Sequence, residues 1–327
     1  KEYERAKRIY CESIESIAIR VASLYFAAIS AQSDYNQSVT KLKDLEDLYA
    51  MSQKRLSLGT ITKGDLLQLE FSMLNAKVTR NEAQVKMNDA FYDLFSYMRV
   101  SHDEKVILLP PENVIEQVLN VNEVLQKAMN NSSHAIGQDL DLLSAQQNLA
   151  KAKAAQGIQM QLNAEVGFNR TADGFASAYS HLQDNEIIGL TISVPIFDWG
   201  VKKGRVMVAK SNLELAKTKK EQADNDYVQS IKREVMQFSL QAEQCRTSQR
   251  ARKISEERYE ITKKRFETGN VSVTELNTAL QELETAKAQY IGQLQSYWNY
   301  YYTLRKFTLY DWVEHKDLIA DFEALVK

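Results

Sequence analysis

The scarcity of helix-breaking residues constrains this chain more than any other feature. Its 327 residues include three prolines and 11 glycines, and the stretches 1–58, 65–109 and 205–268 contain neither residue type. Because proline and glycine interrupt helices, long helices are predicted on either side of one non-helical segment. At the rise of an α-helix, 205–268 alone would span about 95 Å. Helices of compact domains are much shorter, so the sequence predicts an elongated helical protein.

Apolar residues recur every three or four positions along both long helical stretches. This spacing is typical of helices that pack as coiled coils, and we assign it no chemistry. The predicted seam of the first stretch is Ile14, Ile17, Val21, Leu24, Ala28, Ala31, Tyr35, Leu42, Leu45 and Tyr49. That of the later stretch is Ile231, Val235, Phe238, Ala242 and Cys245.

The chain also contains an internal repeat, because residues 55–98 align without a gap with residues 265–308. Seven positions are identical: Arg55, Gly59, Leu66, Ala76, Lys77, Tyr92 and Leu94 match Arg265, Gly269, Leu276, Ala286, Lys287, Tyr302 and Leu304. Self-similarity at a fixed offset indicates two equivalent structural units.

Each repeat begins with the signals of a helix–turn–helix hairpin. A glycine, Gly59 or Gly269, ends the first helix as a C-cap residue. The next helix then begins at a hydroxyl residue followed three positions later by an acid, which is the pattern of a capping box. Helices joined by so short a turn are antiparallel neighbours. The sequence therefore predicts two helical hairpins with similar tips.

The segment 158–196 has a different periodicity, since aliphatic residues alternate with polar or small ones. The apolar set, which is aliphatic except for Phe168 and is called the aliphatic set below, is Leu162, Val166, Phe168, Ile188, Leu190, Ile192, Val194 and Ile196. Alternation of this kind predicts two strands. It fits strands of a membrane barrel, apolar outside and polar inside, and equally a soluble hairpin packed on a core. The aromatic residues Phe168, Tyr179, Phe197 and Trp199 near the strand ends are candidates for an aromatic girdle.

Several functional classes find no support in the sequence. The net charge of −2 provides no basic surface for nucleic acid. None of the four histidines has a histidine or cysteine partner at metal-ligand spacing, and no catalytic or phosphate-binding motif occurs. We therefore expect no enzyme, no metal site and no cofactor. No run of about 18 apolar residues occurs, so no transmembrane helix is expected.

The segment Pro195-Ile196-Phe197-Asp198-Trp199-Gly200 resembles the "PLFDGG" strand exit of TolC-type outer-membrane efflux proteins. The paired tips and the order of helices and strands are also similar to that family over nearly the whole chain. Trp199 replaces a more common glycine. Members of the family begin with a further helix pair and a first β-hairpin. We therefore expect this chain to correspond to a protomer without its N-terminal part.

The resemblance implies a mainly α fold with a β-hairpin, in which long antiparallel helical hairpins form an α-barrel. A homotrimer would close a twelve-stranded barrel in the outer membrane of a Gram-negative bacterium, with most of the chain in the periplasm. The function implied is a passive exit duct of a tripartite efflux or type I secretion system. A periplasmic adaptor would open it and an inner-membrane transporter would supply the energy. The alternatives are a soluble coiled-coil scaffold and the periplasmic adaptor itself.

The expected segments follow the same order. They are the first helical hairpin 1–99, an equatorial segment 100–134, a helix 135–157, the β-hairpin 158–198, the second helical hairpin 199–308 and a C-terminal equatorial segment 309–327. The aliphatic strand residues named above are expected to face lipid.

The tips carry the expected functional residues. Asp65 and Glu275 are equivalent in the repeat and would form a carboxylate ring at the periplasmic mouth, or serve only as capping acids. The expected adaptor contacts are Arg55, Leu56, Leu58, Gly59, Thr60, Arg265, Phe266, Gly269 and Val271. The two arginines could instead only complement helix dipoles. Val271 and Thr278 stand where the family has an arginine and an acid that lock the second tip, which suggests a different latch here.

Overall fold

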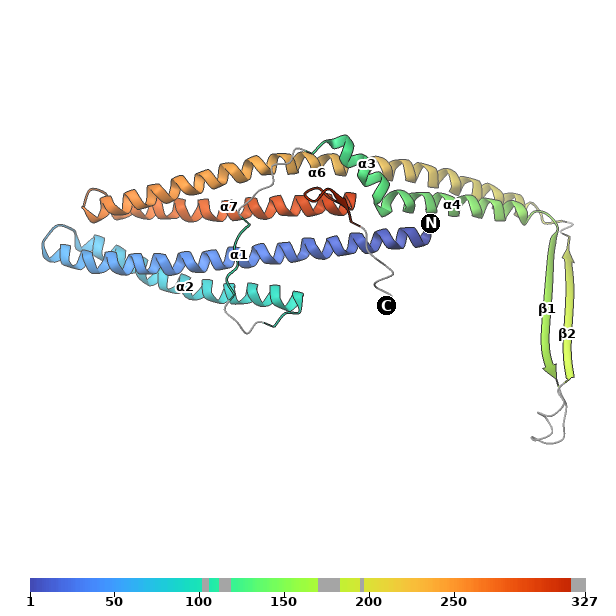
Figure 1. The fold of residues 1–327 in the computed structure, drawn as a ribbon, viewed down its shortest axis with the longest axis horizontal. Helices are drawn as coiled ribbons and strands as arrows, with labels where there is room; N and C mark the ends of the chain where they lie inside the picture. Colours follow the sequence, from blue (N-terminus) through green and yellow to red (C-terminus); the bar gives the residue numbers. More distant parts are fainter. Residues whose placement is uncertain (102–105, 112–118, 170–182, 195–196, 319–327) are drawn as a thin grey trace, which may run out of the picture. The chain divides into compact units, whose positions relative to one another are not determined.

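The protein folds almost entirely into long helices, with one two-stranded hairpin (Figure 1). The computed structural model describes residues 1–327 except 102–105, 112–118, 170–182, 195–196 and 319–327, and it describes only the backbone of 168–169 and 183–185. The helices are α1 (Glu2–Ser57), α2 (Lys63–Met98), α3 (Val121–Asn131), α4 (Ser133–Ala154), α6 (Val201–Glu267) and α7 (Val273–Thr308). The strands are β1 (Gln159–Asn169), β2 (Gln183–Ser193), β3 (Tyr310–Asp311) and β4 (Lys316–Asp317).

The internal repeat is confirmed at the level of secondary structure. α2 and α7 are each 36 residues long, and both begin and end at residues separated by the same offset of the repeat. Both also end at a residue with left-handed backbone geometry, Arg99 at φ 56° and Leu309 at φ 44°. α2 ends at Met98, before the end of the stretch 65–109 that contains no proline or glycine. The N–H of Arg99 bonds the carbonyls of Phe95 and Ser96, which stops α2 there.

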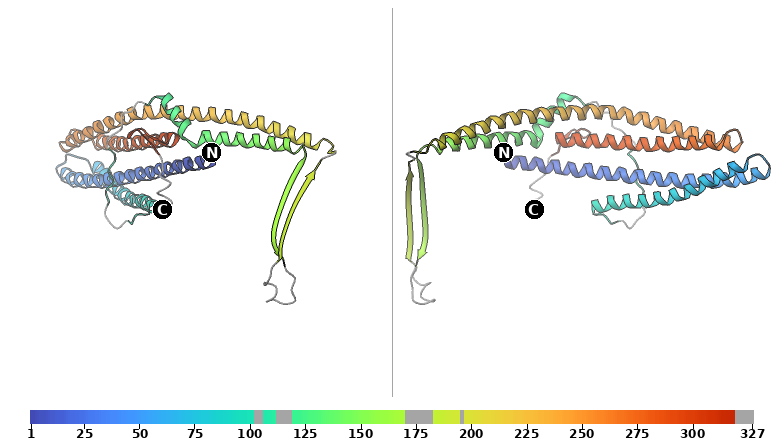
Figure 2. Two further views of the ribbon diagram at one scale, coloured as in Figure 1. Left: turned by 45° about the vertical axis from the view of Figure 1, so that its right-hand side comes forward. Right: turned by 180° about the vertical axis from the view of Figure 1, so that it is seen from behind.

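The chain divides into two compact units, one formed by residues 3–133 and 227–327 and the other by 1–2 and 134–226. In the first unit, α1 and α2 form one antiparallel hairpin, and the later part of α6 forms the second with α7. The tips of both hairpins lie at the same end of this unit (Figures 1 and 2).

Two apolar clusters hold the hairpins of this unit together. Near the tips, Leu45 and Leu69 pack with Phe266 and Leu276 from the other hairpin. Further along, the rings of Phe238 and Tyr297 lie 5.1 Å apart in the larger cluster. The predicted seam is confirmed at Ile231, Val235 and Phe238, which are buried, and at Leu45. Ile14 and Ile17 are about half exposed in the protomer.

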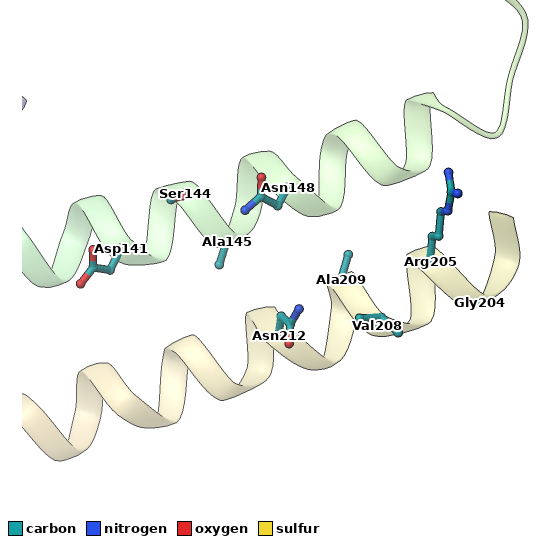
Figure 3. Close-up of a pocket in the computed structure, with 9 residues that line it drawn as sticks. All are labelled: Asp141, Ser144, Ala145, Asn148, Gly204, Arg205, Val208, Ala209 and Asn212. Carbon is teal, nitrogen blue, oxygen red and sulfur yellow. The ribbon is translucent and has the colours of Figure 1, made fainter. Parts of the chain in front are cut away.

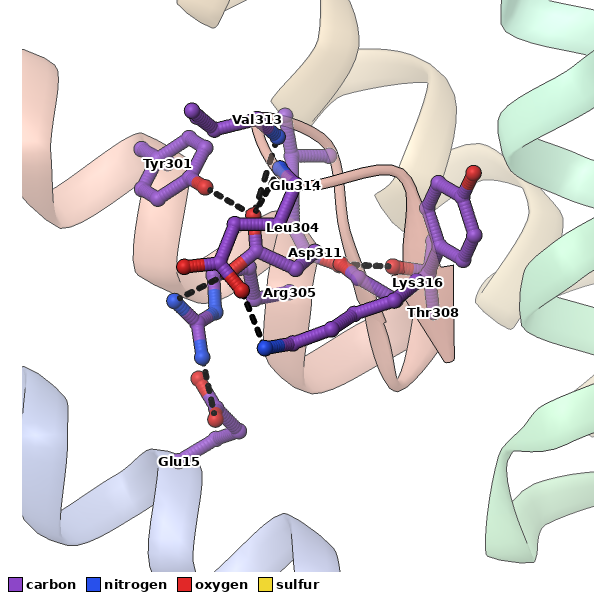
Figure 4. Close-up of polar contacts among 10 residues, drawn as sticks. Glu15, Tyr301, Leu304, Arg305, Thr308, Asp311, Val313, Glu314 and Lys316 are labelled. Carbon is purple, nitrogen blue, oxygen red and sulfur yellow. Dashed lines mark hydrogen bonds and ion pairs between the residues drawn. The ribbon is translucent and has the colours of Figure 1, made fainter. Parts of the chain in front are cut away.

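A buried ionic group joins α1 to the end of α7 (Figure 4). The guanidinium of Arg305 lies 3.0 Å from a carboxylate oxygen of Glu15 and 2.9 Å from one of Asp311. Asp311 also accepts hydrogen bonds from the Tyr301 hydroxyl and the backbone N–H of Val313. This arrangement places two acids around one cation in a region largely shielded from water.

In the other unit, α4 and the first part of α6 run side by side and continue into β1 and β2 (Figures 1 and 2). The strands are antiparallel, and their register pairs Leu162 with Leu190 and Ala164 with Ile188. Directly paired residues lie on the same face of a sheet, so most aliphatic side chains form one face, where Glu186 pairs with Val166. Ile187 lies on the other face, opposite Glu165. The opposite face is mainly polar, and a hydrogen bond there joins Gln161 to Asn163.

One helix departs from the expectation that no segment could cross a membrane as a helix. An 18-residue window of α1 has a mean hydropathy of 1.5, which is apolar enough for a span by length and composition. The sequence analysis looked for a run of about 18 consecutive apolar residues, and the apolar residues of this window are not consecutive. Phe26, Ala28 and Ile29 of α1 are buried, but only 22% of the window is buried in the protomer.

Candidate functional site: the paired hairpin tips

The two tips share one turn geometry, produced by equivalent residues. Gly59 at φ +73° and Gly269 at φ +80° adopt the left-handed conformation that glycine tolerates best. In the first tip the N–H of Thr60 bonds the carbonyl of Arg55 at 3.0 Å. In the second, the N–H of Asn270 bonds the carbonyl of Arg265 at 2.9 Å. These bonds satisfy carbonyls that the helix ends would leave free.

The two acids of the tips, although equivalent in the repeat, have different partners. Asp65 completes the predicted capping box, accepting from the N–H of Thr62 at 3.2 Å and from its hydroxyl at 2.7 Å. The backbone N–H of Glu275 donates to the hydroxyl of Ser272, as in the first tip, but the Glu275 carboxylate lies 3.8 Å from the guanidinium of Arg265. That pair is about half exposed, so it contributes little stability.

The two arginines of the repeat also differ. Arg55 reaches from the first hairpin to the second, where its Nη1 donates to the carbonyl of Phe266 at 3.3 Å. Its guanidinium lies 5.9 Å from the centre of the Phe266 ring. A Cβ atom at Gly269 would stand 2.9 Å from Nη2 of Arg55, so a larger residue there would force the Arg55 side chain to shift. Arg55 therefore complements the C-terminal end of α6 rather than that of its own helix.

A crevice of about 350 Å³ separates the two tips and brings part of the predicted set together. The predicted residues that line it are Arg55, Gly59, Thr60, Asp65, Phe266, Gly269 and Val271. Glu275 is not among its lining residues. The crevice is also lined by Ser52 and Leu69, which sequence reasoning missed. The sequence carries no local signal for these two residues, because their partners on the other hairpin are some 200 residues away.

The remaining tip residues differ in how much surface they offer to a partner. Leu58 is 76% exposed, and Thr60 and Arg265 are exposed as well. Leu56 and Val271 are half-buried. Phe266 is 4% exposed and offers almost no surface. Thr278, expected to replace a locking acid, donates its hydroxyl to the carbonyl of Thr274 in its own helix.

The predicted aliphatic strand residues lie on the surface of the protomer. Exposure between 52% and 79% is found for Leu162, Val166, Ile188, Leu190, Ile192 and Val194. The side chain of Phe168 and the whole of Ile196 and Tyr179 lie outside the described residues. The described side chains of this hairpin pack on no core. In the described part of the chain, no group of three or more His, Cys, Asp or Glu side chains is placed to hold a metal ion.

The profile of the outer membrane efflux protein family matches residues 131–308, more than half of the chain. The chain therefore belongs to this family. No curated protein matches it in sequence.

Solved structures show the same fold. The Campylobacter jejuni CmeC outer membrane channel superposes with a TM-score of 0.72 at 17% identity, covering 99% of this chain and 68% of its own. The Neisseria gonorrhoeae MtrE outer membrane channel gives 0.67 at 18% identity, covering 97% and 72%. The Vibrio cholerae outer membrane protein VceC gives 0.68 at 15%, covering 94% and 72%. At these identities the likeness establishes the fold.

Proposed function

We propose that the protein is the exit duct of an efflux or secretion system in the outer membrane of a Gram-negative bacterium. The observation that carries this proposal is the strand hairpin, whose aliphatic face is exposed while its opposite face is mainly polar. A lone hairpin is barely stable in water. A closed barrel satisfies its backbone edges and lets its aliphatic face contact lipid. The lipid-facing residues would be those of the aliphatic set described above.

Assembly as a homotrimer is supported by an apolar stripe on α2 that has no counterpart on α7. Leu67, Phe71 and Leu74 are each more than half exposed. Their equivalents in α7 are Asn277, Gln281 and Glu284, and Glu284 contacts Lys41 of α1 at 3.1 Å.

The repeat relates α7 to α2 and α1 to α6. By this relation, α6 of a neighbouring copy would cover the α2 stripe, and Ile254 and Ile261 are exposed on α6 to receive it. Three copies related in this way would enclose a helical duct. The helical hairpins 1–99 and 199–308 would form its wall, and the hairpin 158–198 its barrel strands.

The tips would form the periplasmic mouth and the docking surface for a periplasmic adaptor. Leu58, Thr60 and Arg265 offer the most accessible apolar and polar groups there. Phe266 and Gly269 would act indirectly, by holding the second tip against Arg55. Energy would come from an inner-membrane transporter, since a passive conduit has no energy source of its own.

The direct experiment is extraction from outer membranes, imaging in detergent and conductance in planar bilayers. A threefold-symmetric channel is the expected result. A protein that is recovered in the soluble fraction as a monomer contradicts the proposal.

The carboxylates of the mouth have their own test. Replacing Asp65 with Asn and Glu275 with Gln should weaken block by divalent cations, since carboxylate rings attract cations. Asn at position 65 keeps an acceptor for the cap. Unchanged block in the double variant would mean that the two acids only shape the tips.

A further inference from the structure

The junction between the strands and the helices combines unpaired cations with exposed aromatic rings. Lys151 and Lys153 lie in the last turn of α4. Lys202, Lys203, Arg205 and Lys210 lie at the start of α6. These six residues are called the basic cluster below. No acidic residue occurs in 142–157 or in 199–213. The basic cluster is therefore interrupted by no acid within these ranges, and Asp198, in the turn before α6, is the acid next to it.

The pairing of these cations differs from that of cations further along the same helix. Lys217 lies 2.9 Å from Glu214, and Lys220 lies 3.3 Å from Asp139 and 3.2 Å from Asp224. Within the described residues, no member of the basic cluster has an ion-pair partner. The lysines of α4 complement the dipole of their helix end, but those at the start of α6 oppose theirs. Helix stability thus does not account for the α6 cations.

The cations of the basic cluster come from the adjacent ends of two helices, α4 and α6. A groove of about 560 Å³ lies between α4 and α6 and is lined by Asn148, Arg205 and Ala209, among others (Figure 3). Figure 3 shows the guanidinium of Arg205 pointing from α6 toward the end of α4. The cations of both helices therefore lie at one end of this helix pair, next to the strands.

The aromatic residues of the junction are held in exposed positions. Trp199 has a left-handed backbone at φ 52°, which costs a residue with a side chain about 1 kcal/mol. Its side chain is nevertheless 87% exposed, and its ring lies 4.6 Å from that of Phe197 in an edge-on arrangement. The carboxylate of Asp198 accepts the N–H groups of Gly200 at 3.1 Å and Lys202 at 2.8 Å, which fixes the turn.

We infer that this junction binds the anionic headgroups of phospholipids at the face of the membrane nearer the helices. Tryptophan is enriched at membrane–water interfaces, and anionic lipids attract Lys and Arg beside them. The exposed aliphatic strand residues that the structure describes end at Val194, before Trp199 in the chain, and the basic cluster begins after it at Lys202. The order of aliphatic, aromatic and basic residues matches the order of acyl chains, interface and phosphates. This inference rests on the proposed outer-membrane location.

The test uses the purified channel in nanodiscs made of phosphatidylcholine and phosphatidylglycerol in equal amounts. The lipid retained after detergent washing is measured for the parent and two variants. The cluster variant replaces Lys151, Lys153, Lys202, Lys203 and Arg205 with Gln. The matched control replaces five exposed lysines of the other compact unit with Gln: Lys43, Lys77, Lys232, Lys253 and Lys264.

We expect the parent and the control to enrich phosphatidylglycerol. The cluster variant should lose at least about ten-fold of that enrichment, because each basic residue near an anionic surface adds several-fold to the attraction. High salt should weaken enrichment in the parent. Trp199→Gly suits the left-handed backbone, so it should leave folding intact while reducing quenching of tryptophan fluorescence by lipid quenchers at headgroup depth.

Equal enrichment in the cluster variant and the parent, or none in the parent, overturns the inference. So does a preference for lipopolysaccharide over phosphatidylglycerol in a competition arm, because lipopolysaccharide lies in the opposite leaflet. A protein absent from the membrane fraction would contradict the proposed function itself. A protein that inserts normally without selecting anionic lipid would contradict this inference alone.

Discussion

Arg55 and Arg265 occupy equivalent positions in the repeat, yet they bind different groups. Arg55 donates to the carbonyl of Phe266 in the other hairpin, whereas Arg265 lies beside Glu275 in its own. Sequence reasoning predicted both turns, because glycines and caps act locally. It could not predict the partner of Arg55, since that contact depends on how two hairpins separated by some 200 residues pack. The contact between the two tips, from Arg55 to the carbonyl of Phe266, thus arises from the packing of the hairpins.

The two tip glycines provide a matched pair for testing this contact. Gly59→Ala and Gly269→Ala each force a side chain into a left-handed backbone, at a cost of about 1–2 kcal/mol. No atom lies within 4 Å of a Cβ at 59, whereas at 269 it would displace Arg55. Gly269→Ala should therefore raise amide hydrogen exchange in both tips, and Gly59→Ala mainly in the first.

An Arg55→Ala background supplies the control for this pair. In that background, Gly269→Ala should no longer raise amide hydrogen exchange in the first tip, because no Arg55 side chain is present to be displaced. Equal effects of the two glycine changes in the parent would show that Arg55 does not hold the second tip.

The ionic group around Arg305 contains two acids whose pKa values move in opposite directions. Burial raises the pKa of Glu15 above its usual 4.5, although Arg305 counteracts this. Burial also acts to raise the pKa of Asp311, but hydrogen bonds from the N–H groups of Glu314 and Val313 and the charge of Arg305 bring it below its usual 3.8. Hydrogen bonds to the ionised form decide the outcome at Asp311, and loss of water decides it at Glu15.

These directions predict opposite pH dependences for two variants. Glu15 contributes stability that is present below pH 4.5 and is lost as pH rises through its higher folded pKa. Asp311 contributes stability that is present above pH 3.8 and is lost as pH falls through its lower folded pKa. As pH increases from 3 to 7, the difference in apparent Tm between Glu15→Gln and the parent should therefore increase. The same difference for Asp311→Asn should decrease. Parallel curves would contradict the assignment.

At the scale of elements, helix α2 shows which properties the sequence pattern and the repeat predict and which they do not. The breaker pattern predicted both ends of α6 to within a few residues and the start of α2, because glycines and capping residues stand there. It gives no signal at the end of α2, where Arg99 takes a left-handed backbone without being glycine. The alignment also hid a difference in burial, since α7 is enclosed by its neighbours while α2 keeps an exposed apolar stripe.

Changing the α2 stripe tests whether a neighbouring copy covers it. Burying a leucine or phenylalanine is worth about 1.5–3 kcal/mol, whereas surface changes usually stay within about 0.5 kcal/mol. Leu67→Gln, Phe71→Gln and Leu74→Gln together should therefore dissociate most trimers in native mass spectrometry. The exposed residues Lys77 and Glu82 of the same helix, changed to Gln, supply the control. Intact trimers in the triple variant would place the interface elsewhere.

At the scale of the whole molecule, the strand hairpin decides between a membrane protein and a soluble one. Alternation in the sequence predicted its two faces, and the register confirms them. It could not say whether a core or lipid covers the aliphatic face, because both environments select the same side chains. The structure leaves that face exposed in the protomer, which favours lipid.

Two adjacent residues of β2 test this conclusion within one strand. Leu190 lies on the aliphatic face with its partner Leu162, and Thr191 lies on the polar face opposite Gln161. An arginine facing the middle of a bilayer costs about 2–4 kcal/mol, whereas one facing a barrel lumen is tolerated and alters selectivity. Leu190→Arg should therefore reduce the amount of folded trimer in outer membranes. Thr191→Arg should insert normally and reduce cation selectivity in planar bilayers. Equal insertion of both variants would mean that the aliphatic face of the hairpin does not contact lipid.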